Sequence, residues 1–168
     1  MVVVGASPNP SFVSSILKNL LTSGYDGRVA AVNPRYATIL DGACYPSVLD
    51  VPWPIDLAVV GVSWRQFPTL LEQCEQKQVG SLVVITSGFA ESGGDGIQRQ
   101  AELSAWAQRT ATPVGGPNCL GLLHAPSRLH ALPSTFPQLV EGEVGLVLQS
   151  GMMAPRWPTL ARSSEPTR

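Results

Sequence analysis

The sequence predicts an α/β fold in which helices cover both faces of a mostly parallel sheet, giving three layers. Short runs of β-branched residues alternate with amphipathic helical segments along the chain, and this alternation is typical of βαβ units. Among the 168 residues, 44% are hydrophobic and only 14% are charged. That composition provides enough apolar side chain for one well-packed core.

The first βαβ unit is the clearest. Val2 to Val4 form an apolar run that predicts a buried strand, and Gly5 to Pro10 predict a turn. A helix should follow and end at Gly24, because apolar residues recur at helical spacing: Phe12, Val13, Ile16, Leu17, Leu20 and Leu21. Val29 to Val32 then predict the second strand.

An irregular stretch rich in Pro and Gly, from Asn33 to Pro54, separates this unit from the next apolar strand, Leu57 to Val62. A helix is expected to begin near Ser63, whose hydroxyl would form a capping box with Gln66. The apolar face of this helix would carry Phe67, Leu70, Leu71 and Cys74.

The last elements repeat the same order of strand, loop and helix. Ser81 to Ile85 predict a fourth strand, Thr86 to Gly96 a glycine-rich loop, and Ile97 to Arg109 a helix. Pro113 and Val114 predict a short fifth strand. The whole pattern predicts a Rossmann-like domain.

Composition excludes several classes of protein. The formal net charge is -1, from 11 Lys and Arg against 12 Asp and Glu, so a nucleic-acid partner is not expected. The longest apolar stretches are far shorter than the roughly 20 residues of a membrane span. Met1 leads straight into the first strand without the features of a signal peptide, and we therefore expect a cytoplasmic protein.

Cysteine usage favours neither disulfides nor a metal site. The chain has three cysteines, Cys44, Cys74 and Cys119, which are widely spaced and form no CxxC pair. We expect each to be a buried or half-buried small residue.

The loops after the strands are the expected place for a ligand, because an open α/β sheet binds its ligand outside the carboxyl ends of its strands. These loops begin at Gly5, Asn33, Val62, Thr86 and Gly115. The first lies between a strand and a helix, so its backbone N–H groups could hold a phosphate. The alternative is a simple turn, since the second and third glycines of GxGxxG are missing.

The end of the second strand carries Asn33, Pro34 and Arg35. An NAD site would have an Asp or Glu there to bind the ribose. A cation suits a phosphate on that ribose instead, either the 2'-phosphate of NADP or the 3'-phosphate of coenzyme A. The alternative is that Arg35 is only a solvated surface residue.

Seven short segments, taken together and in order, resemble the CoA-binding domain of NDP-forming acyl-CoA synthetases, a group similar to the α subunit of succinyl-CoA synthetase. The resemblance covers about Val2 to Met153. It rests on Gly5-Ala6-Ser7, Val32-Asn33-Pro34-Arg35, Cys44-Tyr45-Pro46-Ser47-Val48, Ile55-Asp56-Leu57-Ala58-Val59, Thr86-Ser87-Gly88-Phe89-Ala90-Glu91, Gly116-Pro117-Asn118-Cys119-Leu120-Gly121 and Gln149-Ser150-Gly151.

The resemblance implies that coenzyme A or an acyl-CoA is the ligand. It places Arg35 near the phosphates of the coenzyme and the segment Gly116 to Gly121 near the pantetheine end, although that segment could equally be a tight turn. The complete set of binding residues implied is Gly5, Ala6, Ser7, Pro8, Asn9, Asn33, Pro34, Arg35, Ile85, Thr86, Ser87, Gly88 and Asn118.

The resemblance also implies a reaction that needs further parts. In the family, CoA ligation passes through a phosphohistidine on a second, flavodoxin-like domain, and an ATP-grasp region handles the nucleotide. We expect residues 1–143 to form the CoA-binding domain and 144–168 to be the start of the second domain followed by a disordered tail. His124 and His130 match no catalytic motif and are expected to be ordinary loop residues.

Three hypotheses remain open from the sequence. The first is a CoA-binding module that binds without turnover. It would be either a fragment of an acyl-CoA synthetase or a stand-alone protein that senses CoA or works with separate chains carrying the phosphohistidine and ATP-grasp parts. The second is a small NADP-dependent oxidoreductase in which Arg35 reads the 2'-phosphate. The third is a vestigial fold without useful affinity. No acyl group or nucleoside diphosphate is indicated by any motif.

Overall fold

The computed structural model describes residues 1–134 and 145–151. In these ranges one sheet has seven strands in the order β3-β4-β2-β1-β5-β6-β7. All neighbouring strands are parallel except the antiparallel pair β3 and β4. The strands are β1 (Val2–Val4), β2 (Ala30–Val32), β3 (Thr38–Ile39), β4 (Gly42–Tyr45), β5 (Ala58–Val60), β6 (Leu82–Val84) and β7 (Val114–Gly115).

The order of the strands reverses at β1. The chain first adds strands outward on one side, through β2 and β4, and then returns to place β5, β6 and β7 on the other side. Val3 of β1 is paired with Ala31 of β2 and Val59 of β5. The carboxyl ends of β1 and β5 therefore form the topological switch point at which such sheets bind ligands.

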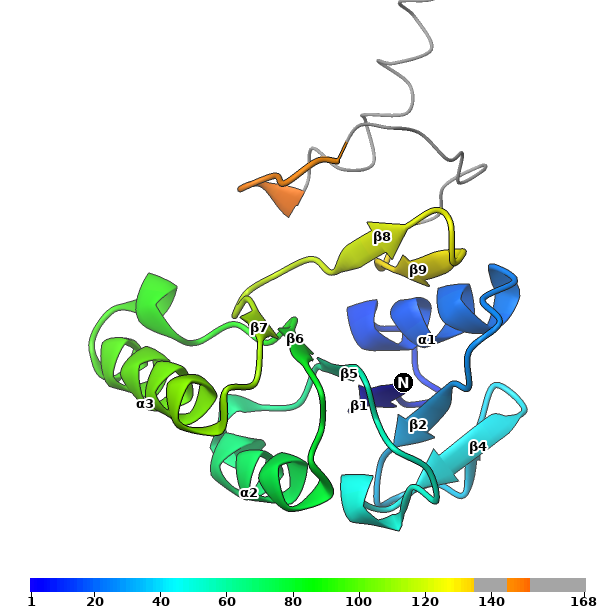
Figure 1. The fold of residues 1–168 in the computed structure, drawn as a ribbon, viewed down its shortest axis with the longest axis horizontal. Helices are drawn as coiled ribbons and strands as arrows, with labels where there is room; N and C mark the ends of the chain where they lie inside the picture. Colours follow the sequence, from blue (N-terminus) through cyan, green and yellow to red (C-terminus); the bar gives the residue numbers. More distant parts are fainter. Residues whose placement is uncertain (135–144, 152–168) are drawn as a thin grey trace, which may run out of the picture.

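Helices cover both faces of this sheet, as the sequence predicts. Figure 1 shows α1 (Phe12–Thr22) on one face and α2 (Phe67–Lys77) with α3 (Asp95–Thr110) on the other. Three short 3-10 helices are η1 (Val48–Asp50), η2 (Trp64–Gln66) and η3 (Ala90–Ser92). The Rossmann-like three-layer architecture is confirmed.

The core is divided between the two faces because successive side chains of a strand point in opposite directions. Val2 and Val4 pack in the cluster that contains residues of α2 and α3. Val3 packs in the cluster that contains residues of α1. All three valines are buried, which explains why this strand is an uninterrupted apolar run.

Two local predictions need correction. The irregular stretch from Asn33 to Pro54 contains β3 and β4, which are too short to show a strand pattern. Ser63 does not form the expected capping box with Gln66: its hydroxyl accepts a hydrogen bond from the backbone of Arg65 at 3.4 Å and caps η2. Helix α2 begins only at Phe67, with Pro68 in its first turn.

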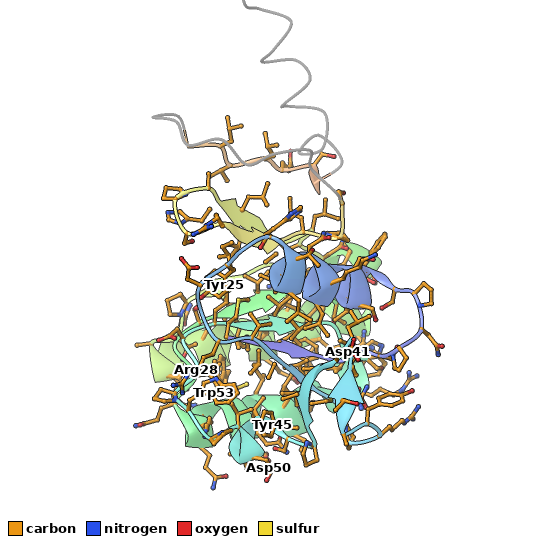
Figure 2. All side chains as sticks on the ribbon, turned by 90° about the vertical axis from the view of Figure 1, so that its right-hand side faces the viewer. Tyr25, Arg28, Asp41, Tyr45, Asp50 and Trp53 are labelled. Atoms are coloured by element: carbon orange, nitrogen blue, oxygen red, sulfur yellow. The ribbon has the colours of Figure 1, made fainter. Side chains whose placement is uncertain are left out.

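An aromatic cluster closes the segment between β4 and β5. Tyr45 and Trp53 make an edge-to-face contact with ring centroids 5.6 Å apart, and the Arg28 guanidinium lies 5.7 Å from the Trp53 ring. Figure 2 shows these three residues next to one another on one side of the domain. The irregular segment is therefore held against the sheet.

A hairpin that the sequence did not predict covers α1. Strands β8 (Leu122–His124) and β9 (Leu129–Ala131) pair antiparallel and lie beside α1 in Figure 1. Asn19 of α1 donates hydrogen bonds to the carbonyls of Leu132 at 2.7 Å and Ser134 at 3.0 Å. A buried amide on a largely apolar helix face thus fixes the hairpin in place.

The two histidines lie on this hairpin, and not in loops as expected. His124 ends β8, and its Nδ1 lies 2.8 Å from the hydroxyl of Ser127. His130 is in β9, where burial lowers the pKa of its imidazole. Both histidines are therefore part of the β8–β9 hairpin.

The three cysteines are buried or half-buried, as predicted. Cys44 and Cys74 are buried and Cys119 is half-buried. Burial raises the pKa of the Cys74 thiol to about 12, so this thiol stays protonated and unreactive at neutral pH. In the part of the chain that the structure describes, no group of His, Cys, Asp and Glu could hold a metal ion.

The predicted boundary at residue 143 lies outside the described ranges, and so does the end of the chain, for which a disordered tail is predicted. Among the helices described, none has the length and apolar character needed to cross a membrane.

Candidate functional site

A cleft of about 810 Å³ lies at the switch point of the sheet. It is bounded by the carboxyl ends of β1, β2 and β5, by the loops that follow these strands and β4, and by α2 as far as Gln73. Its lining residues are Val4, Gly5, Ser7, Asn9, Val32, Asn33, Pro34, Arg35, Tyr36, Pro46, Gly61, Val62, Ser63, Arg65, Gln66, Thr69, Leu70 and Gln73.

Two glycines lie where the strands of the switch point end. Gly5 follows β1 with φ of +95°, and a Cβ on it would lie 2.7 Å from the carbonyl oxygen of Gly61. A Cβ on Gly61 would lie 1.9 Å from Cγ2 of Val13 in α1. The first turn of the chain can approach β5 this closely only because both positions lack a side chain.

Serine side chains hold the loop between β1 and α1. Ser11 is the N-cap of α1, and its hydroxyl accepts a hydrogen bond from the backbone of Ser14 at 3.1 Å. The Ser14 hydroxyl in turn bonds both backbone groups of Ser7, accepting at 3.2 Å and donating at 2.8 Å. The loop is thus fixed in front of the helix N-terminus, where backbone N–H groups and the helix dipole favour an anion.

Asn33 ties the first loop to the end of β2. Its amide nitrogen donates to the carbonyl of Ala6 at 2.8 Å, and its amide oxygen accepts from the backbone of Arg35 at 3.0 Å. An aspartate would lose the first of these bonds because a carboxylate cannot donate. Asn33, at the position where an NAD site would have its ribose-binding acid, therefore stabilises the loop structure here.

The electrostatics of the cleft favour an anionic ligand. Two arginines, Arg35 from the loop after β2 and Arg65 from the loop after β5, line it, and the lining contains no Asp or Glu. Within the described ranges the Arg35 guanidinium makes no ion pair. Arg65 lies 4.5 Å above the ring of Trp64. Both cations are therefore available to a phosphate.

Six of the predicted site residues line the cleft: Gly5, Ser7, Asn9, Asn33, Pro34 and Arg35. Two residues of the first loop do not. Ala6 is fully buried, and its carbonyl is the acceptor for Asn33. Pro8 is exposed and lies outside the lining.

The other five predicted residues lie outside the cleft lining, at the ends of β6 and β7. Thr86 donates from its hydroxyl to the carbonyl of Val62 at 2.7 Å and accepts from the backbone of Asn118 at 2.9 Å. Ile85 and Ser87 flank Thr86, and Gly88, with φ of +98°, gives room to Trp64. This group is connected to the cleft wall through Val62.

The sequence alone did not identify Arg65, Gln66, Thr69 and Gln73 as lining residues. The loop beginning at Val62 was expected to face the ligand, but none of its residues belonged to a ligand-binding motif. The usable signal is the spacing of Gln66, Thr69 and Gln73, which places three polar side chains on one face of a helix.

A second cavity, of about 510 Å³, lies on the other side of α2, between α2 and α3. We call it the groove. It is mostly aromatic and aliphatic, and its charged lining residues belong to both signs: Arg65, Arg99, Arg109, Glu72, Glu75 and Glu102.

Comparison with known proteins identifies related chains. A family model described as a CoA binding domain matches residues 1–125. ADP-forming acetate–CoA ligase I of Archaeoglobus fulgidus is 40% identical over 152 residues, which are 89% of this chain and 22% of that protein. The α subunit of ADP-forming acetate–CoA ligase I of Pyrococcus furiosus is 35% identical over 158 residues, covering 90% of this chain and 34% of the subunit.

Solved structures agree with the fold. A crystal structure of a Pyrococcus horikoshii OT3 protein matches with a TM-score of 0.87 at 32% identity, over 96% of this chain and 37% of that chain.

The strand order and the cleft at the switch point define a nucleotide-binding domain of the doubly wound α/β type. The match over residues 1–125 shows that the chain belongs to the family of CoA-binding domains, here of the kind found in NDP-forming acyl-CoA synthetases. The oxidoreductase alternative is not favoured. The chain spans 22% and 34% of the lengths of these two relatives.

Proposed function

We propose that this chain binds coenzyme A in the cleft at the switch point and presents it to the other parts of an NDP-forming acyl-CoA synthetase. The observation that carries the proposal is the charge of the cleft: two arginines line it and no carboxylate does. Coenzyme A brings a diphosphate and a 3'-phosphate, so an acid-free cleft with two cations suits it better than it suits NAD.

The fold supports a position for each phosphate. The diphosphate belongs at the loop from Gly5 to Pro10, in front of the N-terminus of α1. The 3'-phosphate of the ribose belongs at Arg35, which follows the ribose-proximal end of β2. Asn33 then acts by holding these two loops together, through its bond to Ala6.

The pantetheine arm accounts for the predicted residues outside the cleft. Strands β6 and β7 follow β5 along the same edge of the sheet. An arm that leaves the diphosphate at β1 and crosses β5 would pass Ile85, Thr86, Ser87 and Gly88, and then Asn118. The hydrogen bonds that join Thr86 to Val62 and Asn118 support one continuous surface here.

The relatives support a proposal for the reaction of the whole protein. They are ADP-forming CoA ligases or their α subunits, so we propose acyl-CoA formation coupled to a nucleoside diphosphate product. A phosphohistidine domain and an ATP-grasp region, on the same or separate chains, would be the partners of this domain.

Isothermal titration with CoA, dephospho-CoA, NADP and NAD tests the binding. We expect CoA to bind most tightly, and Arg35→Ala to weaken CoA by about tenfold to a hundredfold, because a charge-assisted hydrogen bond contributes about 1.5 to 3 kcal/mol. Dephospho-CoA should lose much less. Arg128→Ala, which removes an exposed arginine of the hairpin that pairs with Asp26, is the matched control and should leave CoA binding unchanged.

Two outcomes would contradict the proposal. NADP binding more tightly than CoA would return the site to the oxidoreductase alternative. Equal losses for CoA and dephospho-CoA in Arg35→Ala would remove Arg35 from the 3'-phosphate.

A further inference from the structure

Helix α2 presents a row of polar side chains to the cleft. Gln66, at its N-cap, and Thr69 and Gln73 within it all line the cleft. Their spacing of three and four residues places them on one face of the helix. We call these three residues the α2 wall. Phe67, Leu70 and Cys74 are the buried residues of the same helix, so the wall is separate from the residues that fix α2 to the sheet.

The fold does not use the polar atoms of the α2 wall. Within residues 1–134 and 145–151, none of the three side chains takes part in a hydrogen bond with another residue. Gln98 of α3, by contrast, donates to Glu102 at 2.9 Å. Gln73 is half-buried, and its amide carries donors and an acceptor that no other residue of the described ranges uses.

The proposed function assigns no binding residues to the base of the coenzyme, and the inference, which rests on that function, concerns this base. The diphosphate is assigned to the loop before α1 and the 3'-phosphate to Arg35. The base extends from the same ribose, and the rest of the cleft is bounded by the α2 wall together with apolar Val32, Pro46 and Leu70. A flat ring with a polar edge matches apolar surfaces beside a row of polar groups.

We propose that the α2 wall recognises the adenine base, and that Gln73 is the residue that determines this specificity. The edge of adenine carries the N6 amino donor next to ring-nitrogen acceptors. A glutamine amide offers one acceptor and a donor side by side and pairs with that edge through two hydrogen bonds. Val32, Pro46 and Leu70 would contact the faces of the ring.

The test compares CoA with 1,N6-etheno-CoA, in which an added ring removes the N6 donor but leaves every phosphate unchanged. We expect wild type to bind CoA about tenfold more tightly than etheno-CoA. Gln73→Leu should weaken CoA by a similar factor and leave etheno-CoA nearly unaffected, so that the two changes are not additive. Gln76→Leu makes the same chemical change at an exposed position of α2 outside the cleft and should alter neither affinity.

Other results would overturn the inference in distinguishable ways. Equal binding of CoA and etheno-CoA by wild type, or an equal loss for both ligands in Gln73→Leu, would show that Gln73 does not contact the edge of the base. The same loss in Gln76→Leu would show a general effect on α2. If wild type bound neither coenzyme, the proposed function itself would fail.

Discussion

The two sides of helix α2 face two cavities of opposite construction. The cleft lies between α2 and the ends of the strands, and most of its lining residues are glycines or polar side chains. The groove lies between α2 and α3, and large side chains such as Trp64 and Trp106 form it. One helix thus separates a cavity lined mostly by glycines and polar side chains from one formed by large aromatic side chains.

The charged side chains of the two cavities also differ, in whether they have partners within the fold. In the groove, Arg109 pairs with Glu75 through a bond of 2.8 Å between Nη2 and Oε2. Arg99 lies 3.7 Å above the Trp64 ring and donates to the carbonyl of Gly88 at 2.7 Å. The Arg35 side chain in the cleft has no such partner among the described residues. Charges that are paired within the fold indicate a structural role, whereas a cation without an ion pair in an acid-free cleft indicates a ligand.

The largest expected effect follows from removing both cations of the cleft. Arg35→Ala combined with Arg65→Ala should weaken CoA binding by about a hundredfold or more, since each charge-assisted hydrogen bond contributes about 1.5 to 3 kcal/mol. Isothermal titration at low and high salt should also show a smaller salt dependence in the double variant.

Arg109→Ala is the matched change in the groove and should leave CoA affinity unaltered. If this variant weakened CoA as much as the double variant, the distinction between the two cavities would be wrong.

A smaller effect is expected on stability from filling the switch point. Gly61→Ala places its Cβ 1.9 Å from Cγ2 of Val13, and overpacking of this kind costs about 1 to 3 kcal/mol. Gly115→Ala is the control, because its Cβ would meet nothing closer than 3.7 Å. Thermal unfolding should show a lower melting temperature for Gly61→Ala alone.

Adding Val13→Ala to Gly61→Ala removes the overlapping methyl group. The double variant should therefore recover part of the loss predicted from the two single variants, a coupling that unfolding measurements detect. Strict additivity would show that the contact between α1 and β5 is not tight.

The sequence predicted the architecture well because the central strands are buried on both faces. Such strands form continuous apolar runs, as Val2 to Val4 and Leu57 to Val62 do, and runs of this kind can be recognised locally. Strands β3 and β4, and the β8–β9 hairpin, were missed. These are short, partly exposed strands whose pairing is fixed by distant contacts, such as the bonds from Asn19 to residues after β9.

The candidate site was also predicted only in part, because some of its residues are placed by local chain order and others by contacts between distant elements. Backbone-determined features such as Gly5 and the position of Arg35 after β2 can be inferred from strand and loop order. The contribution of α2 depends on how that helix is rotated against the sheet, and η2 sets this by delaying the start of α2 to Phe67. The prediction for Ile85, Thr86, Ser87, Gly88 and Asn118 came from the family resemblance and remains a prediction.

The smallest expected effect concerns the paired charges of the groove. The hydrogen bonds from Arg109 hold the pKa of Glu75 below its ordinary value. A lowered folded-state pKa means that the pair stabilises the fold at pH values above the ordinary carboxyl pKa, and that this contribution is lost as the pH falls through the lowered pKa. Glu75→Gln should therefore lower the melting temperature slightly at neutral pH, because an exposed ion pair contributes little.

The difference between Glu75→Gln and wild type should disappear in acid. Glu72→Gln, a change on the same helix at a carboxylate without an ion pair among the described residues, should show no such pH dependence. CoA affinity should be the same in all three proteins, because the groove holds no part of the ligand. If the difference in melting temperature persisted at acid pH, the ion pair between Arg109 and Glu75 would not be its cause. A change in CoA affinity would show that the groove contributes to CoA binding, and the distinction between the two sides of α2 would then be wrong.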